Sequence, residues 1–378
     1  MDTFAQQRSL VNYWLPVLAA GLLAWLGFLV VGKTPLIRAS GLTLAIVGVT
    51  LTLRRLGAVL ALIGGLTLAF SPAFWSQTGG AQSLLPAPTV LAMIIAGLMG
   101  VVFIRVTKRP YIALGLGLLI FAVIFWSQIG TPRSLRLTGL LTAWLLVILV
   151  QALLISNPRP DEPPAQSISP QQYLGILLIL FAGVVNDPLF VLLLPATALG
   201  LWLSRTPLRW WYWVALLIIA VLGLRGILVT YVDATWWSYS SVAAHNTGYR
   251  ERYLIADGWR EGIRWLDLVK LVIKQTTIFG AVLSVLGLTR MTRWYPVLGI
   301  VLMLAYVSYA IFGLVYFGTD REILIMPLFI IQVIWLTYAV YTFCHWLAKP
   351  GKPSIYRLRW LAIGAYLLLP IYFLISNA

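Results

Sequence analysis

Residues 172–204 read QYLGILLILFAGVVNDPLFVLLLPATALGLWLS, an apolar stretch in which Asp187 is the one charged residue. A helix needs about 20 apolar residues to cross a bilayer, so this stretch holds either one long helix or two short ones. Asn186-Asp187-Pro188 interrupts the apolar residues near the middle. Asp followed by Pro is a favoured start of a helix. We therefore expect two short spans, over residues 172–185 and 189–204.

The rest of the chain has the same apolar character. Of its 378 residues, 61% are hydrophobic and 10% are charged, which leaves a soluble protein too little polar surface. The apolar runs lack the two-residue alternation of barrel strands, so helices are expected. The sequence predicts an all-α, polytopic membrane bundle of about 11–13 transmembrane helices. The predicted spans are 13–31, 39–53, 56–75, 88–105, 110–127, 138–156, 172–185, 189–204, 210–230, 268–289, 295–317, 323–342 and 360–376.

The charged residues predict an orientation. With these spans, the basic clusters fall on one side of the membrane and most acids on the other, and cytoplasmic loops are the ones enriched in Lys and Arg. We expect a multi-pass protein of a bacterial plasma (inner) membrane, with its N-terminus cytoplasmic and its C-terminus extracytoplasmic. A single helix over 172–204 would divide the clusters between the two sides. The clusters are Arg54/Arg55, Arg105/Lys108/Arg109, Arg205/Arg209, Arg290/Arg293 and Lys349/Lys352/Arg357/Arg359.

The spans group into two halves. Residues 1–156 form an N-terminal half of about six spans, and residues 172–378 form a C-terminal half that includes an external loop, residues 231–267. The linker between the halves, residues 157–171, is rich in Pro, Ser and Gln and is expected to be cytoplasmic.

The external loop ends in an amphipathic segment. Its residues Ile255, Trp259, Ile263 and Leu266 recur at steps of four, four and three, with charged residues on the other faces. This pattern predicts an external helix that lies in the membrane interface with its tryptophan at the depth of the headgroups.

Several classes of function are disfavoured. The net charge of +16 comes from residues scattered between apolar runs, which is not the basic stripe of a nucleic-acid-binding protein. One cysteine, Cys344, and two histidines, His245 and His345, leave no disulfide and no expected Cys/His metal site. The sequence has neither GxxxxGK[ST] nor HExxH. It identifies no cofactor and no ligands that support a divalent metal.

Two charged residues stand out because apolar sequence surrounds them. Asp187 is expected to cap the helix that begins at Pro188, and a carboxylate at such a break can also face a polar cavity. Arg225 lies within the span 210–230. It either extends to the headgroups or grips a lipid-linked phosphate, for which a planar guanidinium suits bidentate contact.

Further candidates lie in the predicted external turns. Asp320-Arg321-Glu322 forms a tight turn that is either a solvated charged turn or a rim that positions a headgroup or sugar. His245, in the external loop, is either an ordinary polar-loop residue or a general base.

Two similar segments end spans at the same predicted surface. Residues 73–79, AFWSQTG, are echoed by residues 124–130, IFWSQIG. Aromatic residues are common at membrane interfaces, which accounts for the likeness. Alternatively, Gln77 and Gln128 are polar edges of one external cavity.

Three segments carry a resemblance to a known group of membrane enzymes. Residues 66–77, LTLAFSPAFWSQ, resemble the span with a Ser-Pro…Ser-Gln ending of GT-C-type glycosyltransferases. Residues 174–203 are similar to the paired short helices of that superfamily, and residues 317–327, FGTDREILIMP, resemble its late Gly-x-x-Arg…Pro turn. The resemblance spans about residues 56–345.

The resemblance implies transfer of a sugar from a polyprenyl-phosphate carrier to an acceptor on the extracytoplasmic side. The usual first-loop acid of the family is absent, because residues 32–38 read GKTPLIR. Either Asp187, Asp233 or Glu322 supplies the base, or the protein keeps the architecture without the reaction. The alternative is a non-catalytic subunit of a larger membrane complex. A transporter is less favoured, because no inverted repeat with matched broken helices is evident. The expected partners are membrane lipids, the carrier-linked sugar if the protein is an enzyme, and other membrane subunits if it is not.

Overall fold

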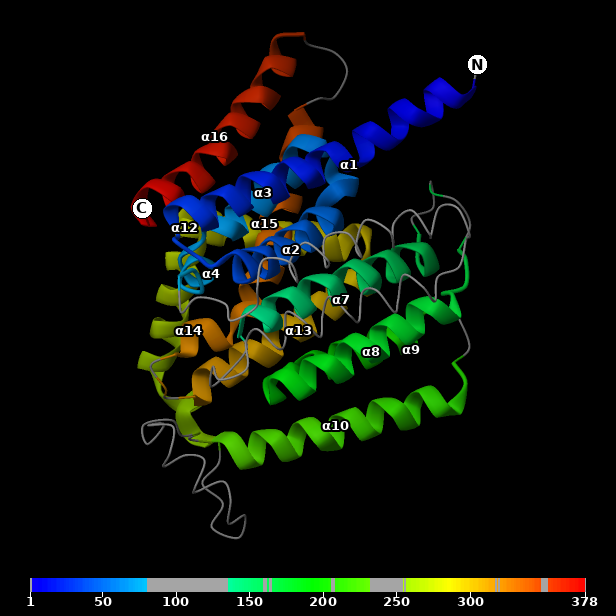
Figure 1. The fold of residues 1–378 in the computed structure, drawn as a ribbon, viewed down its shortest axis with the longest axis vertical. Coiled ribbons are helices and arrows are strands. Elements are labelled where there is room, and N and C mark those ends of the chain that lie inside the picture. The colour runs from blue at the N-terminus through cyan, green and yellow to red at the C-terminus, as the bar shows by residue number, and fades with distance from the viewer. Residues whose placement is uncertain are drawn as a thin grey trace.

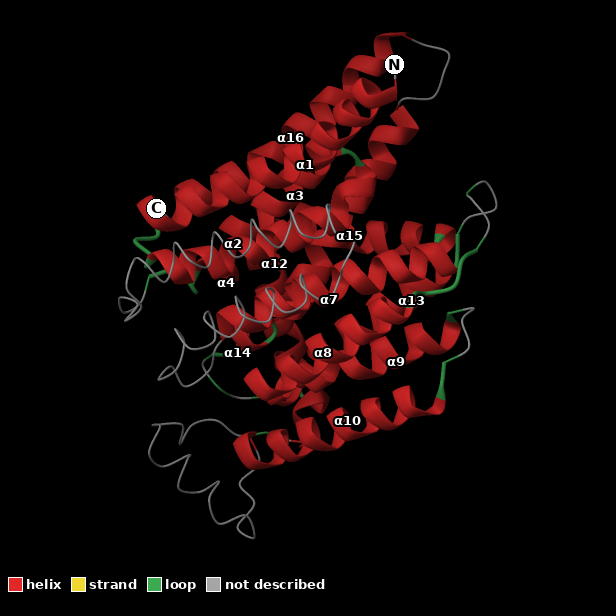
Figure 2. Ribbon diagram, turned by 45° about the vertical axis from the view of Figure 1, so that its right-hand side comes forward, coloured by secondary structure: helices red, strands yellow, loops and turns green. Residues whose placement is uncertain are grey.

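The structure is a computed structural model. It describes residues 2–79, 135–158, 162, 165–204, 208–231, 254, 256–316, 318, 320–347 and 353–377. These residues form helices joined by short connections, with no strand among them (Figure 2). Within them, eight helices are long and apolar enough to cross a membrane, and three shorter apolar helices accompany them. The predicted all-α polytopic bundle is confirmed, while the predicted spans 88–105 and 110–127 lie outside the described residues.

The helices follow the predicted spans closely. In chain order they are α1 (Asp2–Leu26) with the π-helical turn η1 (Gly27–Val31), α2 (Leu36–Leu53), the 3₁₀ turn η2 (Arg54–Leu56), α3 (Ala58–Phe70), α4 (Pro72–Trp75), α7 (Leu135–Ser156), α8 (Pro170–Asn186), the 3₁₀ turn η3 (Pro188–Leu193), α9 (Leu194–Leu203), α10 (Trp210–Tyr231), the 3₁₀ turn η4 (Ala256–Arg260), α12 (Gly262–Trp294), α13 (Pro296–Val315), α14 (Arg321–Leu324), α15 (Met326–Leu347) and α16 (Pro353–Asn377).

The long helices alternate in direction, so the bundle has two ends, and the chain termini lie at opposite ends (Figure 1). The α14 end carries α4, α14 and the end of α16, where Asn377 Nδ2 donates to the carbonyl oxygen of Phe70 (2.8 Å). The η2 end carries η2 and the C-terminal ends of α12 and α15. Described members of the predicted cytoplasmic clusters lie at this second end. They are Arg54, Arg55, Arg209, Arg290, Arg293 and Arg359.

The chain reverses direction at Asp187, so residues 172–204 form a hairpin. α8 begins with a capping box between Ser169 and Gln172 and ends at Asn186, after which η3 and α9 run back beside it (Figure 1). The two arms touch closely, because a Cβ at Gly183 would lie 2.1 Å from the ring of Phe190. The predicted division of this stretch into two helices at Asn186-Asp187-Pro188 is therefore confirmed, while the crossing of the membrane by each helix stays a prediction.

The centre of the bundle is α15. In its spanning segment 83% of the residues are buried, whereas only 17% are buried in the spanning segment of α10, at the edge of the bundle. Small residues let the helices approach, as is common in membrane bundles. A Cβ at Gly287 of α12 would lie 1.9 Å from the carbonyl oxygen of Trp335 in α15, and one at Gly48 of α2 would lie 3.0 Å from Ala143 of α7.

α12 bends sharply at Thr277, whose backbone has φ 65° and ψ 169°. Positive φ is strained for a β-branched residue. Neighbouring contacts hold the bend, since the Thr276 hydroxyl accepts from Gln332 Nε2 (2.8 Å) and the Thr277 hydroxyl accepts from the Gly280 amide (3.4 Å). Residues 262–276 consequently lie across the α14 end, while residues 278–294 return along the bundle (Figure 1).

The first half of α12 corresponds to the predicted interfacial helix, with different bounds. The expected continuous pattern from Ile255 to Leu266 is broken, because residues 256–260 form the turn η4 and Glu261 is extended. The helix starts at Gly262 and continues beyond the predicted end, up to the bend. Its apolar residues Ile263 and Leu266 remain exposed. An exposed apolar face on a helix that lies across a bundle end fits the membrane interface.

Candidate functional site: a charged cluster at the α14 end

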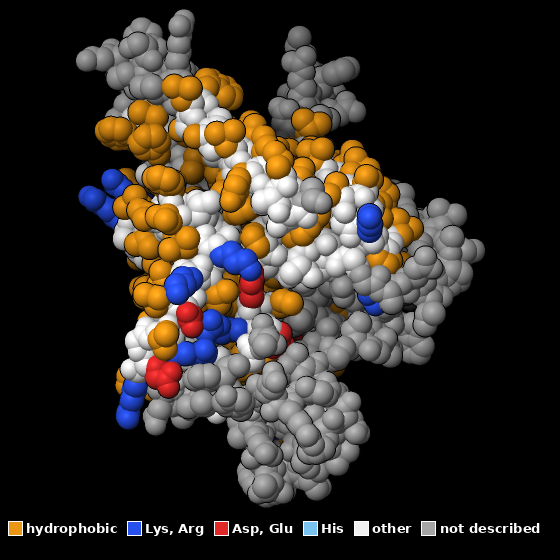
Figure 3. All heavy atoms as spheres, turned by 90° about the vertical axis from the view of Figure 1, so that its left-hand side faces the viewer, with side chains coloured by type: hydrophobic (Ala, Val, Ile, Leu, Met, Phe, Trp, Pro, Cys, Tyr) orange, Lys and Arg blue, Asp and Glu red, His pale blue; other side chains and the backbone are white. Residues whose placement is uncertain are grey.

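Charged side chains of both signs gather on the face of the α14 end (Figure 3). They come from the first half of α12 and from α14, the short turn between α13 and α15. We call the group of Arg264, Lys274, Gln275, Arg321 and Glu322 the end-face cluster. Its members are up to 58 positions apart in the chain, and the bend of α12 places them together.

Glu322 is the centre of this cluster. Its carboxylate accepts one hydrogen bond from Lys274 Nζ (2.8 Å) and one from Gln275 Nε2 (2.6 Å). Gln275 is buried, and its Oε1 in turn accepts from the backbone amide of Ala73 in α4 (2.8 Å). The carboxylate is thus held in a fixed position between α14, α12 and α4, with one charged donor and one neutral donor.

The two arginines of the cluster close the C-terminal end of α13. Arg264 Nε donates to the carbonyl oxygen of Leu314 (3.2 Å), and its Nη2 donates to the carbonyl oxygens of Gly313 (3.4 Å) and Tyr316. Arg321 Nη1 donates to the same Gly313 carbonyl (3.4 Å). The last carbonyl groups of a helix attract cations, so both guanidinium groups stabilise this helix end.

The proximity of these two cations affects their chemistry. Partial burial, and then the positive charge of Arg264, lower the pKa of the Arg321 guanidinium below its ordinary value, while Asp267 acts in the opposite direction. Arg321 keeps its charge at neutral pH, because the arginine side chain is effectively always protonated in proteins. The cluster therefore presents an excess of positive charge around one carboxylate.

Asp187 is placed as a helix cap. Its side chain is 1% exposed, and Oδ1 accepts from the backbone amide of Leu189 (3.0 Å). Oδ2 accepts from the hydroxyl of Thr138 in α7 (3.4 Å), which itself accepts from Asn186 Nδ2 (3.0 Å). These contacts fit the cap interpretation and tie the hairpin to α7. They occupy the carboxylate within the bundle, where it is not a member of the end-face cluster.

Arg225 and Gln77 are also outside the cluster. Arg225 is exposed on α10, next to Gly226, where a Cβ would lie 2.7 Å from Pro188 of the hairpin. Gln77 is buried in the turn after α4. This turn is joined to the first loop through the Gly79 amide, which donates to the Thr34 hydroxyl (2.9 Å). The candidates Gln128, Asp233 and His245 lie outside the described residues.

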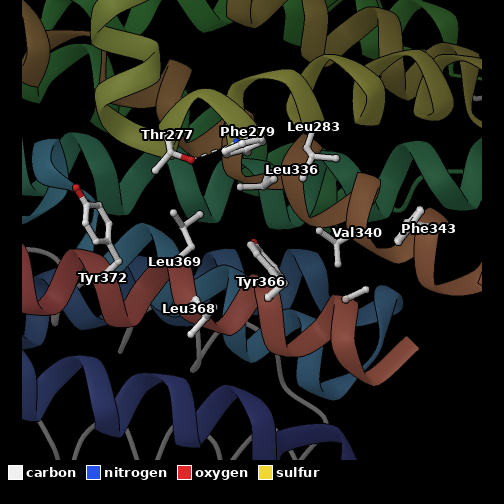
Figure 4. A pocket seen from close by; sticks show the side chains of 13 residues that line it. Thr277, Phe279, Leu283, Leu336, Val340, Phe343, Tyr366, Leu368, Leu369 and Tyr372 are labelled. Atoms are coloured by element: carbon white, nitrogen blue, oxygen red, sulfur yellow. Dashed lines mark hydrogen bonds between the residues drawn. The ribbon is translucent and has the colours of Figure 1, made fainter. Parts of the chain in front are cut away.

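An apolar groove begins beside the cluster. Its first part, about 440 Å³, is lined by Lys274, Ile278, Tyr372 and Ser376 among others. It continues into a space of about 550 Å³ between the second half of α12, α15 and α16. Figure 4 shows Tyr366 and Leu369 of α16 pointing towards Leu336 of α15 across this space. Lys274 thus borders both the groove and Glu322.

The sequence did not single out Lys274 or Gln275. The available signal was weak: Lys270 and Lys274 lie four positions apart in an otherwise apolar run, as on one face of a helix. Among the described residues, no group of three or more His, Cys, Asp or Glu side chains is arranged to hold a metal ion. The arrangement suits binding of an anion with an apolar tail, next to a carboxylate that can accept a proton.

Comparison with known proteins assigns no family to the chain. No protein-family model matches it, and no curated protein matches it in sequence.

Proposed function

We propose that the protein is a GT-C-like glycosyltransferase that takes a sugar from a polyprenyl-phosphate carrier at the α14 end, on the extracytoplasmic side. The observation that carries the proposal is the position of Lys274. Its ammonium is 2.8 Å from the Glu322 carboxylate, and its side chain lines the start of an apolar groove. A lipid phosphate has the matching chemistry, with a charged head and a long apolar tail.

The proposed reaction uses the two residues together. Glu322 removes the proton of an acceptor hydroxyl, and the acceptor oxygen bonds to the anomeric carbon of the sugar. The bond from that carbon to the phosphate oxygen breaks, and its electron pair leaves with the polyprenyl phosphate, which Lys274 stabilises. A phosphate that pairs with Lys274 leaves the Glu322 carboxylate hydrogen-bonded to Gln275 and facing the acceptor.

The second candidate is a non-catalytic membrane subunit. It is favoured by the fact that both described candidate carboxylates, Asp187 and Glu322, already hold structural contacts. The low burial of α10, at 17%, also leaves a long apolar surface for lipid or another protein. In this alternative the end-face cluster orders the bundle end without chemistry.

Turnover by the purified protein tests the proposal. We expect proteoliposomes to consume a member of a panel of undecaprenyl-phosphate-linked hexoses and pentoses in the presence of a glycan acceptor. The variant Glu322→Gln should lose at least about 100-fold in kcat, because a positioned base contributes about that much. It should still fold, because an ion pair in which one partner is largely exposed contributes little stability.

Glu261→Gln is the matched control, since Glu261 is exposed near the start of α12 and outside the cluster. It should keep the activity of the unchanged protein. Absence of turnover with every donor, together with stoichiometric copurification with other membrane proteins, would favour the subunit instead.

A further inference from the structure

A second cavity lies at the η2 end, opposite the end-face cluster. It has a volume of about 760 Å³ between the C-terminal ends of α12 and α15. The side chains that matter for its chemistry are Arg290, Trp294, Tyr341, His345 and Trp346. Arg290 and His345 are both exposed, so a ligand can reach their nitrogen atoms.

The parts of α12 and α15 that form the cavity carry no acid to balance Arg290. The chain contains no Asp or Glu in residues 268–319 and none after Glu322. The described carboxylate of Glu162 lines a neighbouring cavity, where it accepts a hydrogen bond from the Tyr295 hydroxyl (2.6 Å). The charge of Arg290 therefore favours an anionic ligand.

Aromatic residues place this cavity at the depth of lipid headgroups. Trp294 and Trp346 are half or more exposed at the end of the bundle, and tryptophan prefers the membrane interface. The ring of Tyr341 lies parallel to that of His345, with 6.1 Å between their centroids. A ligand bound here has its charged part in the interface.

The cavity continues into the apolar groove. Leu283 and Phe343 line both spaces, so the polar cavity and the groove of about 550 Å³ between α12, α15 and α16 are contiguous. The labelled side chains of the groove are almost all apolar (Figure 4). Phe279 on its wall is 82% exposed, so the groove is open along the side of the bundle.

We infer that this site binds an anionic phospholipid, with its phosphate at Arg290 and His345 and an acyl chain in the groove. A soluble anion has no apolar part that could fill the groove, and an uncharged lipid has no group that could pair with the charge of Arg290. With the predicted orientation, the site faces the cytoplasmic leaflet, where anionic lipids attract basic residues. The anion-binding end of this site is separate from the proposed reaction, which takes place at the other end, but both lipids would use the groove of about 550 Å³ for their apolar chains.

Lipid titration of the full-length protein tests the inference. In native mass spectrometry with phosphatidylglycerol, we expect Arg290→Gln/His345→Gln to bind roughly tenfold more weakly than the unchanged protein, as for a lost charge-assisted contact. Arg293→Gln is the control, because Arg293 is exposed on the same helix end but does not line the cavity. Equal losses in both proteins would mean diffuse attraction and would overturn the site.

The apolar part needs its own variant. Ala365 is exposed on the α16 wall of the groove, so Ala365→Trp should weaken phosphatidylglycerol binding while every charge remains. Leu361→Trp, at an exposed position of α16 outside the lining, should not. Unchanged binding by Ala365→Trp, or equal competition by soluble glycerol phosphate, would contradict a lipid occupant. Both tests measure lipid binding, so their results can be interpreted even if the protein has no transferase activity.

Discussion

At the scale of the residue, Asp187 has a role that can be separated from its charge. Its Oδ1 caps η3 through the Leu189 amide. Asp187→Ala should therefore lower the free energy of unfolding by about 1 kcal/mol, whereas Asp187→Asn keeps an oxygen acceptor and should lose much less. Thermal unfolding in detergent measures both. If Asn is as harmful as Ala, the negative charge itself is required and the cap does not explain Asp187.

At the scale of the element, the hairpin of α8 and η3 depends on Gly183. A Cβ at this position would meet the Phe190 ring at 2.1 Å, so Gly183→Ala should destabilise the protein by about 1–3 kcal/mol through overpacking. Gly183→Ala/Phe190→Leu should recover part of this loss, because the two sites are coupled. Gly364→Ala is the control, since nothing lies within 4 Å of its Cβ position. Equal losses at Gly183 and Gly364 would refute the close contact.

At the scale of the whole molecule, the orientation is open to a direct test. Trp259 and Trp294 are 49% and 50% exposed and lie at opposite ends of the bundle. In a Cys344→Ala background, an impermeant maleimide added to intact cells should label Trp259→Cys and not Trp294→Cys, because basic clusters remain in the cytoplasm. Labelling of Trp294→Cys alone would reverse the orientation and move the end-face cluster to the cytoplasm.

The same three scales explain how much of this protein the sequence predicts. The spans and the hairpin at Asn186-Asp187-Pro188 were predictable, because apolar length and a Pro break are local signals. The pair Lys274–Glu322 was not, because 48 positions separate the two residues and their contact depends on the bend of α12. The bend itself could not be predicted from a local signal, because residues 276–278 contain no Pro or Gly. The division into halves at residues 157–171 stays a prediction.

The bend at Thr277 divides α12 into two helical arms that run in different directions. One arm lies across the α14 end and holds Lys274, while the other arm forms a wall of the groove along which a lipid chain is proposed to lie. The two arms share one backbone, so the helix that forms the groove wall also carries the ammonium that meets Glu322. The proposed lipid groove and the Lys274–Glu322 pair therefore depend on the same helix, on either side of one bend.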